Sequence, residues 1–446
     1  MKNLISRIQW LILILAILLP FAVIRIFPKF HHSYDLRVFR TWAEAWQTDW
    51  RDIYINCETC NYPFVGTLLS GGVMSTIDYK NVARVINRFR YYLAVIDAVN
   101  VLALWFILTR LQVRNAPLWA GVIGLLPSSW VSSSVWGQID GIGQLLILLF
   151  FILLIWFNAK GRAGWQAYLY FLLAGLLLSL MLLTKQLIYF SLGALGLIVF
   201  VNIVYLSKNG RTFLAYTFMS AFTFLLPILL VDASLQLKPP YFSHIQYILA
   251  TGSQHGDQIA SLGFNIWTLF TKDLLGTSHN PLQIGPISLA PLTPFSTGYI
   301  LFAILVISLL IIFVLDLRRQ NTETKTFNRG QIISALIFFS LINLAFNLTL
   351  TGTHERYLYH FYPFMLMACL GLLSSSRYFN RTLLIVTFSG ALFYGAYLFA
   401  YLSGTIRPTD QTVIQSAAVI HLCLFIYLFY SWIRNSNSQS INSSLS

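Results

Sequence analysis

Long uncharged apolar runs recur along almost the whole chain, and they limit its fold more than any other feature. A run of about 20 apolar residues is long enough, as an α-helix, to cross the roughly 30 Å hydrocarbon core of a bilayer. Inside that core every backbone N–H and C=O must be paired within the protein, so such a run has to be helical. The sequence therefore predicts an all-α integral membrane protein.

Twelve such runs can be delimited, and an even number of spans places both termini on one side of the membrane. The expected spans are 8–27, 91–109, 116–132, 141–158, 167–184, 187–207, 212–232, 297–316, 330–350, 358–375, 381–402 and 412–432. A further apolar stretch, 62–78, is interpreted as a short helix lying at the outer surface. A span there would move the arginine-rich loops to the outside.

Basic and acidic residues are distributed unequally between the loops. Short connections rich in Lys and Arg, such as 110–114, 208–211 and 318–329, fall on the same side as the termini. Most acidic residues fall on the other side. The positive-inside rule assigns the basic side to the cytoplasm, so both termini are expected there.

The overall charge balance excludes one class of partner. The chain has a formal net charge of +14, yet only 10% of its residues are charged and 57% are hydrophobic. No soluble domain is left to bind nucleic acid, so we assign the positive charge to the membrane faces. We expect one polytopic transmembrane domain over 1–432 with outer loops at about 28–90 and 233–296. A disordered cytoplasmic tail rich in Ser and Asn is expected over 433–446.

Cys57 and Cys60 form a C-x-x-C motif in the first outer loop. Without a second pair the motif is too small for a zinc site. Two interpretations remain, a disulfide on an oxidising face or two free thiols.

The first outer loop begins with a segment of helical periodicity. Its apolar stripe consists of Leu36, Phe39, Ala43, Trp46 and Trp50. We expect an amphipathic helix in the membrane interface, with its tryptophans at headgroup depth. Asp35 stands just before this helix. It is either a helix N-cap or a general base held at the membrane surface.

Basic residues also occur on the outer side, against the positive-inside expectation. Lys80, Arg84 and Arg88 are spaced four apart and line one helix face. They bind either lipid headgroups or a phosphate of a specific substrate. Lys185 and Gln186 lie at an outer hairpin tip, where a lysine can also simply extend its ammonium group to water.

Two further clusters are expected at the outer ends of spans. In "WGQIDGIGQ", Trp136 and Asp140 share a helix face, and a carboxylate at such depth indicates a functional site. In "THERY", His354 and Arg356 suit phosphate binding, with Glu355 orienting Arg356. The alternative is a Glu355–Arg356 pair that only anchors the helix end.

The order of these motifs resembles that of the C-type fold (GT-C) membrane glycosyltransferases, especially mannosyl- or glucosyltransferase-like members that use polyprenyl- or dolichyl-phosphate sugars. The motifs are D-x-x-x-F-x-x-W at 35–42, NYPF at 61–64, WGQID at 136–140, TKQ at 184–186, GFNIWTLF at 263–270 and HERYLY at 354–359. They extend over about 31–375. The chain departs from the pattern in having a lone acid in "SYD" and YPF where many relatives have YPP.

The resemblance implies an inverting transfer of a hexose from a polyprenyl-phosphate donor to a lipid-linked or polysaccharide acceptor. The reaction is expected at the outer face of a bacterial cytoplasmic (plasma) membrane, with Asp35 as the family's usual catalytic acid. Competing functions are a transporter or flippase, or a polymerase, of lipid-linked oligosaccharides.

The candidate residues follow from these motifs. The catalytic candidates are Asp35 and Asp140. The donor-phosphate candidates are His354, Arg356, Lys185, Arg84 and Arg88, and the orienting or substrate-binding candidates are Glu355, Gln138, Gln186, Trp136, Tyr62 and Asn265. No cofactor is expected. A monophosphate leaving group does not demand a metal ion and the chain has no D-x-D pair, although a divalent metal is not excluded.

Overall fold

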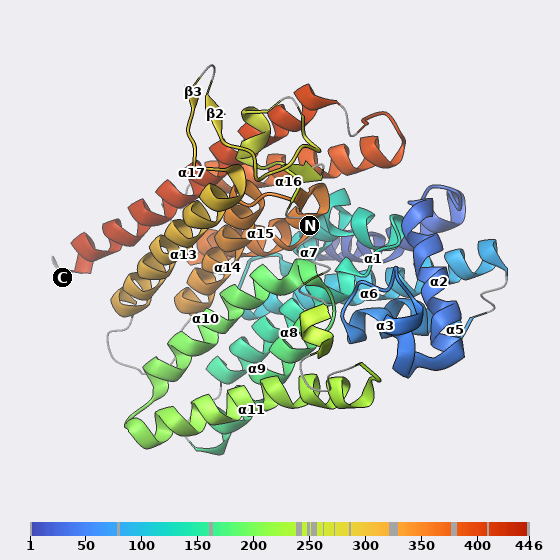
Figure 1. Ribbon diagram of the computed structural model, residues 1–446. Helices are drawn as coiled ribbons and strands as arrows, with labels where there is room; N and C mark the ends of the chain where they lie inside the picture. The colour runs from blue at the N-terminus through green and yellow to red at the C-terminus, as the bar shows by residue number, and fades with distance from the viewer. Residues whose placement is uncertain are drawn as a thin grey trace. The chain divides into compact units, whose positions relative to one another are not determined.

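We describe a computed structural model of the protein. It describes residues 2–77, 81–159, 164–237, 243–247, 250, 257–261, 263–271, 273–284, 287–320, 329–375, 381–407 and 410–443. The chain divides into two compact units, Met1–Gly252 and Ser253–Ser446, and each is described by itself (Figure 1). The sequence predicts one domain over 1–432. Apolar spans continue through both units, so no change of composition marks the division.

Ten helices of the described chain are long and apolar enough to cross a membrane. In the first unit they are α1 (Lys2–Ile26), α6 (Val82–Arg110), α8 (Asp140–Ala159), α9 (Trp165–Leu182), α10 (Tyr189–Leu206) and α11 (Gly210–Ser234). In the second unit they are α13 (Pro294–Arg319), α14 (Arg329–Thr349), α16 (Arg381–Leu402) and α17 (Gln411–Ser443). Each overlaps an expected span. The protein is thus a helical integral membrane protein.

The expected span 116–132 is broken in the structure. Helix α7 (Ala116–Leu125) ends after 10 residues. The chain then forms a 3₁₀ turn η3 (Pro127–Ser129) and a π-helical turn η4 (Val131–Val135). Pro127 explains the break, because a proline disfavours helical backbone in the residue before it, and Leu126 is extended. The uninterrupted span predicted here is therefore wrong.

The expected span 358–375 is also shorter than predicted. Helix α15 (Tyr362–Ser375) is preceded by a separate 3₁₀ segment, η7 (Glu355–His360). Pro363 lies in the first turn of α15, where its missing N–H costs no helical hydrogen bond. The proline thus sets the start of α15. The full number of membrane spans stays a prediction.

The helix expected after Asp35 is present as α2 (Ser33–Asp49), but its apolar stripe does not face lipid as predicted. Leu36, Phe39, Trp42 and Ala43 are at most 2% exposed and pack in the core of the first unit. A periodic stripe shows which side of a helix is apolar. It cannot show whether lipid or protein covers that side, because both are hydrocarbon-like.

Short helices follow α2 in the first unit. They are η1 (Trp50–Asp52), α3 (Ile53–Asn56), α4 (Phe64–Thr67), the π-helical η2 (Leu68–Gly72) and α5 (Val73–Ser75). The last three form one apolar helix, Phe64–Ser75, that is too short for the roughly 20 residues of a span. This confirms the short helix predicted within 62–78, of which residue 78 lies outside the described residues.

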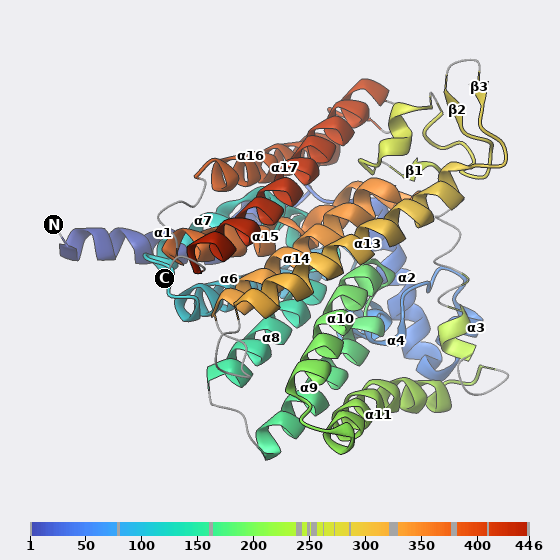
Figure 2. The same cartoon turned by 90° about the vertical axis from the view of Figure 1, so that its left-hand side faces the viewer.

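The helices of each unit pack in pairs. In the first unit α9 lies beside α11, and α1 beside α7 (Figure 1). Gly175 of α9 permits the closest approach, because a Cβ there would overlap the Ser220 backbone of α11. In the second unit α14 lies between α13 and α15, and its residues from Gln331 to Thr349 are all buried (Figure 2).

Short strands complete the second unit. Strand β1 (Ala260–Ser261) pairs in parallel with β4 (Thr353–His354), and β2 (Gln283–Ile284) pairs antiparallel with β3 (Ile287–Ser288). The remaining element before α13 is the 3₁₀ turn η6 (Ile266–Leu269). Helix α17 continues to Ser443, whereas the sequence predicts disorder from 433. Once a helix has formed, each added residue gains a hydrogen bond, so weak helix formers such as Ser and Asn can extend it.

His244 joins the end of α11 to the short helices that follow α2. Its Nε2 accepts a hydrogen bond from the Phe64 N–H at 3.2 Å, and its backbone N–H donates to Asp232 Oδ1 at 2.8 Å. Burial lowers the pKa of His244 to about 4. A ring nitrogen that accepts a hydrogen bond carries no proton, so the packed imidazole is neutral.

We predict that acidification loosens this region. The pKa of His244 is about 4 in the fold and about 6.5 in an unfolded chain, so the unfolded state binds more protons between these values. Stability should therefore fall as the pH drops from about 6.5 to 4, by up to about 3 kcal/mol from this residue. Thermal unfolding in detergent between pH 7.5 and 4.5 measures the effect.

The variant His244→Gln keeps a hydrogen-bond acceptor without titrating in this range, so it should show a smaller pH-dependent loss of Tm. His279, whose side chain is 51% exposed, offers the matched control His279→Gln, which should keep the full loss. An unchanged pH profile in His244→Gln would contradict the prediction.

Candidate functional site

A tight turn between η4 and α8 presents the "WGQID" motif. Gly137 has φ of 96°, a left-handed conformation that favours glycine, so Trp136 and Asp140 do not share one helix face as the sequence predicts. A Cβ on Gly137 would also overlap the Leu36 side chain. This close approach brings the turn against the first turn of α2, which carries Asp35.

Asp35 is held by side chains of this turn. Its Oδ2 accepts hydrogen bonds from Trp136 Nε1 at 2.7 Å and from Gln138 Nε2 at 2.6 Å. His32 Nδ1 lies 3.1 Å from the same oxygen. The N-cap interpretation of Asp35 is wrong, because His32 occupies the N-cap of α2 and Asp35 lies within the first turn. The carboxylate is instead fixed in one orientation by groups about 100 residues away in the chain.

Gln138 links Asp35 to a second charged pair. Its Oε1 accepts hydrogen bonds from the Tyr62 hydroxyl at 2.7 Å and from Lys185 Nζ at 3.0 Å. Lys185 also forms an ion pair with Asp140, and its ammonium lies 5.0 Å from the centre of the Tyr62 ring. The first unit thus brings together six of the predicted site residues. They are Asp35, Tyr62, Trp136, Gln138, Asp140 and Lys185.

The two carboxylates differ in accessibility. The Asp140 side chain is 0% exposed, and it accepts a further hydrogen bond from Ser132 Oγ at 2.8 Å. The Asp35 side chain keeps 17% exposure. Lys185 is also buried, so the prediction that it extends to water is wrong. An ammonium group this deep is stable only beside a counter-charge, which Asp140 supplies.

The segment 57–62 positions Tyr62. Cys57 and Cys60 form a disulfide, which settles the choice left open by the sequence. The Tyr54 hydroxyl donates to the Tyr62 carbonyl at 2.8 Å, and Gln186 Nε2 donates to the Asn61 carbonyl. Gln186 therefore supports the loop that carries Tyr62.

Arg90 is a residue of this site that the sequence reasoning missed. It is fully buried and donates to the carbonyls of Pro28, Phe30 and Ser134 at 2.9–3.1 Å. These bonds fix the segments that lead into Asp35 and into Trp136. The sequence signal that could have identified Arg90 is its place on the apolar stripe of α6. Ile86, Arg90, Leu93, Asp97, Asn100 and Leu104 recur at spacings of three and four and form the buried face of α6.

Arg84 and Arg88 lie on the exposed side of α6. Lys80, the third member of the predicted basic stripe, lies outside the described residues. The buried contacts of the Asp35 cluster therefore come from Arg90 and not from these two arginines.

The second unit carries the His354 cluster. The Glu355 side chain is 2% exposed, and its Oε2 lies 3.8 Å from His354 Nδ1. The sequence predicts Arg356 as the partner of Glu355, whereas the imidazole of His354 lies beside it. Arg356 is half-buried and His354 keeps 18% side-chain exposure, so both are partly accessible.

Asn265 holds the backbone next to His354. Its Nδ2 donates to the Ile259 carbonyl at 2.8 Å and lies 3.1 Å from Thr353 Oγ1. Trp267 Nε1 donates to the Thr349 carbonyl at 2.6 Å. The GFNIWTLF motif thus holds the strand that leads into His354. Asn265 is fully buried, so its contacts serve the backbone.

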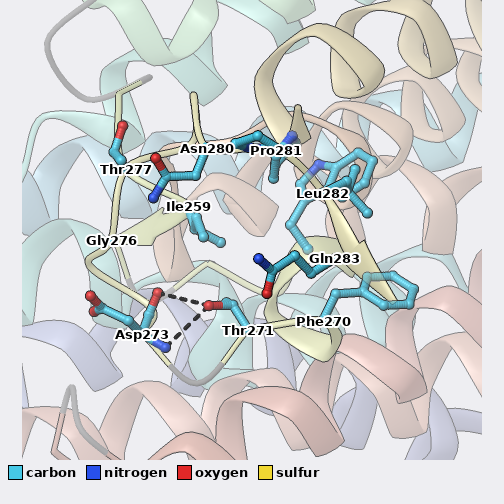
Figure 3. Close-up of a pocket in the computed structure, with 12 residues that line it drawn as sticks. Ile259, Phe270, Thr271, Asp273, Gly276, Thr277, Asn280, Pro281, Leu282 and Gln283 are labelled. Atoms are coloured by element: carbon cyan, nitrogen blue, oxygen red, sulfur yellow. Dashed lines mark hydrogen bonds between the residues drawn. The ribbon is translucent and has the colours of Figure 1, made fainter. Parts of the chain in front are cut away.

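A pocket of about 290 Å³ opens in the same unit between η6 and β2 (Figure 3). Its polar groups include Thr271, Asp273, Asn280 and Gln283, and Phe270 forms part of its apolar wall. Amide, hydroxyl and carboxylate groups around an apolar wall suit a ligand rich in hydroxyl groups.

Comparison with protein-family models and with curated proteins finds no match to this chain. Within the described residues, no three His, Cys, Asp or Glu side chains gather as ligands for a metal ion.

We predict that the Lys185–Asp140 pair is essential for folding. Removing one partner leaves an unpaired buried charge, so Lys185→Met or Asp140→Leu should each lower stability by about 3–5 kcal/mol. The double variant removes both charges and should recover much of this loss. Thermal unfolding of the single and double variants measures the coupling.

The exposed pair Arg40–Glu44 offers a matched control. Arg40→Met and Glu44→Leu should each change stability by less than about 1 kcal/mol, because surface ion pairs are weak. If the Lys185/Asp140 double variant were no more stable than the worse single variant, the pairing would not be the cause.

Proposed function

We propose that the protein is an inverting glycosyltransferase that moves a hexose from a polyprenyl-phosphate donor to a lipid-linked or polysaccharide acceptor. One observation carries the proposal. Asp35, the acid that the GT-C resemblance assigns to catalysis, is fixed by Trp136 and Gln138 and yet stays partly exposed. We further propose that the site faces outward in a bacterial cytoplasmic membrane.

A positioned carboxylate suits this reaction. A sugar hydroxyl is a poor nucleophile, and a base that takes its proton in the transition state contributes roughly 10²–10⁴-fold. In our proposal Asp35 accepts the proton from the acceptor hydroxyl as that oxygen attacks the anomeric carbon. The bond from this carbon to the phosphate oxygen breaks at the same time, and its electron pair leaves on the polyprenyl phosphate.

The leaving phosphate needs positive charge around it. The THERY motif suggests His354 and Arg356 for this role. Both are partly accessible within the second unit, and imidazole and guanidinium groups donate strongly to phosphate oxygens. Glu355 lies beside His354 and, in this proposal, orients its ring toward the phosphate.

We assign Asp140 and Lys185 to positioning and not to direct chemistry. Both are buried, and the charge of Lys185 is balanced by Asp140. Their contribution is to hold the Gln138 amide, whose Nε2 then points at Asp35.

Transport of a lipid-linked saccharide is the second candidate function. The observation that favours it is Asp97, a buried carboxylate in the interior of the membrane helix α6, since such residues are typical of transport pathways. A transporter would move the lipid-linked sugar without releasing polyprenyl phosphate, so the products separate the two functions.

We predict that Asp35→Asn abolishes turnover. The amide is nearly isosteric but cannot act as a base, so release of polyprenyl phosphate from a synthetic polyprenyl-phosphate hexose should fall by about 10²-fold or more. Arg356→Ala should lower turnover, because the leaving phosphate would lose a positively charged hydrogen-bond donor. Purified protein in nanodiscs, with product release followed by mass spectrometry, provides the measurement.

Glu44→Gln is the matched control, because Glu44 is an exposed carboxylate on the same helix as Asp35. It should keep wild-type turnover. Full turnover in Asp35→Asn would overturn the assignment of the base, and a folded wild-type protein that released no polyprenyl phosphate from any of a panel of hexose donors would overturn the proposed function.

A further inference from the structure

A small cavity lies inside the first unit, lined by residues of α1, α6, α7 and α8 and of the turns that follow α7. Its volume is about 10 Å³, close to that of one water-sized sphere. Asp97, Asn100 and Gln144 line it together with Ala16 and Pro20. Asp97 and Asn100 belong to the interior of α6, so the cavity belongs to the membrane-spanning part of the unit.

Several polar atoms around this cavity lack a hydrogen-bond partner within the described chain. They are Asn100 Oδ1 and both amide atoms of Gln144, on side chains that are at most 2% exposed. Buried polar atoms are nearly always paired in folded proteins. The cavity therefore has the properties of a site for a small polar occupant.

Helix α1 adds a further oxygen. Pro20 lies within this helix and has no N–H to donate to the Ala16 carbonyl four residues earlier. Ala16 and Pro20 both line the cavity. A backbone carbonyl released by a proline in a membrane helix is satisfied by a neighbouring group or a bound species.

The excess of hydrogen-bond acceptors over donors in this cavity indicates that its occupant is a cation. Oxygen acceptors predominate, with Asp97, Asn100, Gln144 and Ala16 supplying them, whereas the Gln144 amide NH₂ is the donor. Among the described residues that line the cavity none is basic, so none balances the Asp97 charge. A buried carboxylate in a membrane is stable only with a counter-charge or a proton.

We propose that this cavity binds a single Na⁺ ion. One carboxylate balances one positive charge, which favours a monovalent over a divalent ion. The volume admits an occupant no larger than a water molecule, which favours a small ion. Carboxylate, amide and backbone oxygens are the ligands of hard cations, and broken or proline-containing helices are where membrane proteins present them.

The site would also stabilise the turn that carries Trp136 and Gln138. Asp97 Oδ2 accepts from the Ser134 N–H at 3.3 Å, and Asn100 Nδ2 donates to the Gly141 carbonyl at 2.8 Å. These two backbone groups flank the turn. A bound ion would therefore fix the side chains of Asp97 and Asn100, which hold the two ends of this turn. This inference does not depend on the proposed glycosyl transfer.

The test is thermal unfolding of the purified protein in NaCl, compared with choline chloride at equal ionic strength. A ligand that binds only the folded state raises Tm with its concentration. We expect a saturable, Na⁺-specific rise in the wild type. Above the dissociation constant it should be on the order of a few degrees for each tenfold increase in Na⁺. Asp97→Asn should abolish the rise.

Gln144→Leu serves as a second variant if Asp97→Asn fails to fold, and it should weaken the response to Na⁺. Asp316→Asn is the matched control, because Asp316 is a buried carboxylate of α13 that already bonds Ser334 Oγ. It should keep the Na⁺-dependent rise. Equal Tm values in NaCl and choline chloride would overturn the proposal and leave a water molecule beside a protonated Asp97. Retention of the full rise in Asp97→Asn or in Gln144→Leu would overturn it as well.

Discussion

A charged or amide side chain inside an apolar protein is stable only when its hydrogen bonds are satisfied, and in the first unit those bonds meet at Gln138. Its amide nitrogen donates to Asp35, and its amide oxygen accepts from Tyr62 and Lys185. The orientation of the Asp35 carboxylate therefore depends on a chain of partners that ends at buried Asp140. Fixed in this way, the partly exposed carboxylate keeps one orientation.

The backbone around this network is constrained by a few residues. Arg90 donates to three carbonyls in the segments that lead into Asp35 and Trp136, and Gly137 allows the turn that points Trp136 and Gln138 toward α2. Asp97 and Asn100 hold the two ends of the same turn. One face of α6 thus supports the candidate site over several helical turns, which explains why polar residues persist on the buried side of a membrane helix.

Particular residues show how far the sequence could be interpreted. The motifs singled out Asp35, Trp136, Gln138, Asp140 and Lys185, and the structure places them in one network. Their roles were less predictable. Lys185 was expected to contact a phosphate or water, yet it neutralises Asp140. Asn265 was expected near a substrate, yet it supports the backbone before His354. Residue type shows that a partner is needed, but only packing shows which partner is within reach.

The sequence by itself determined that this is a helical membrane protein, because hydrocarbon tolerates no unpaired backbone and the long apolar runs leave no other choice. It also located ten of the long helices, since span length follows bilayer thickness. Tertiary structure alone decided that the stripe of α2 packs against protein and that Asp35 faces Gln138. These outcomes depend on contacts between residues about 100 positions apart, which no local period or spacing encodes.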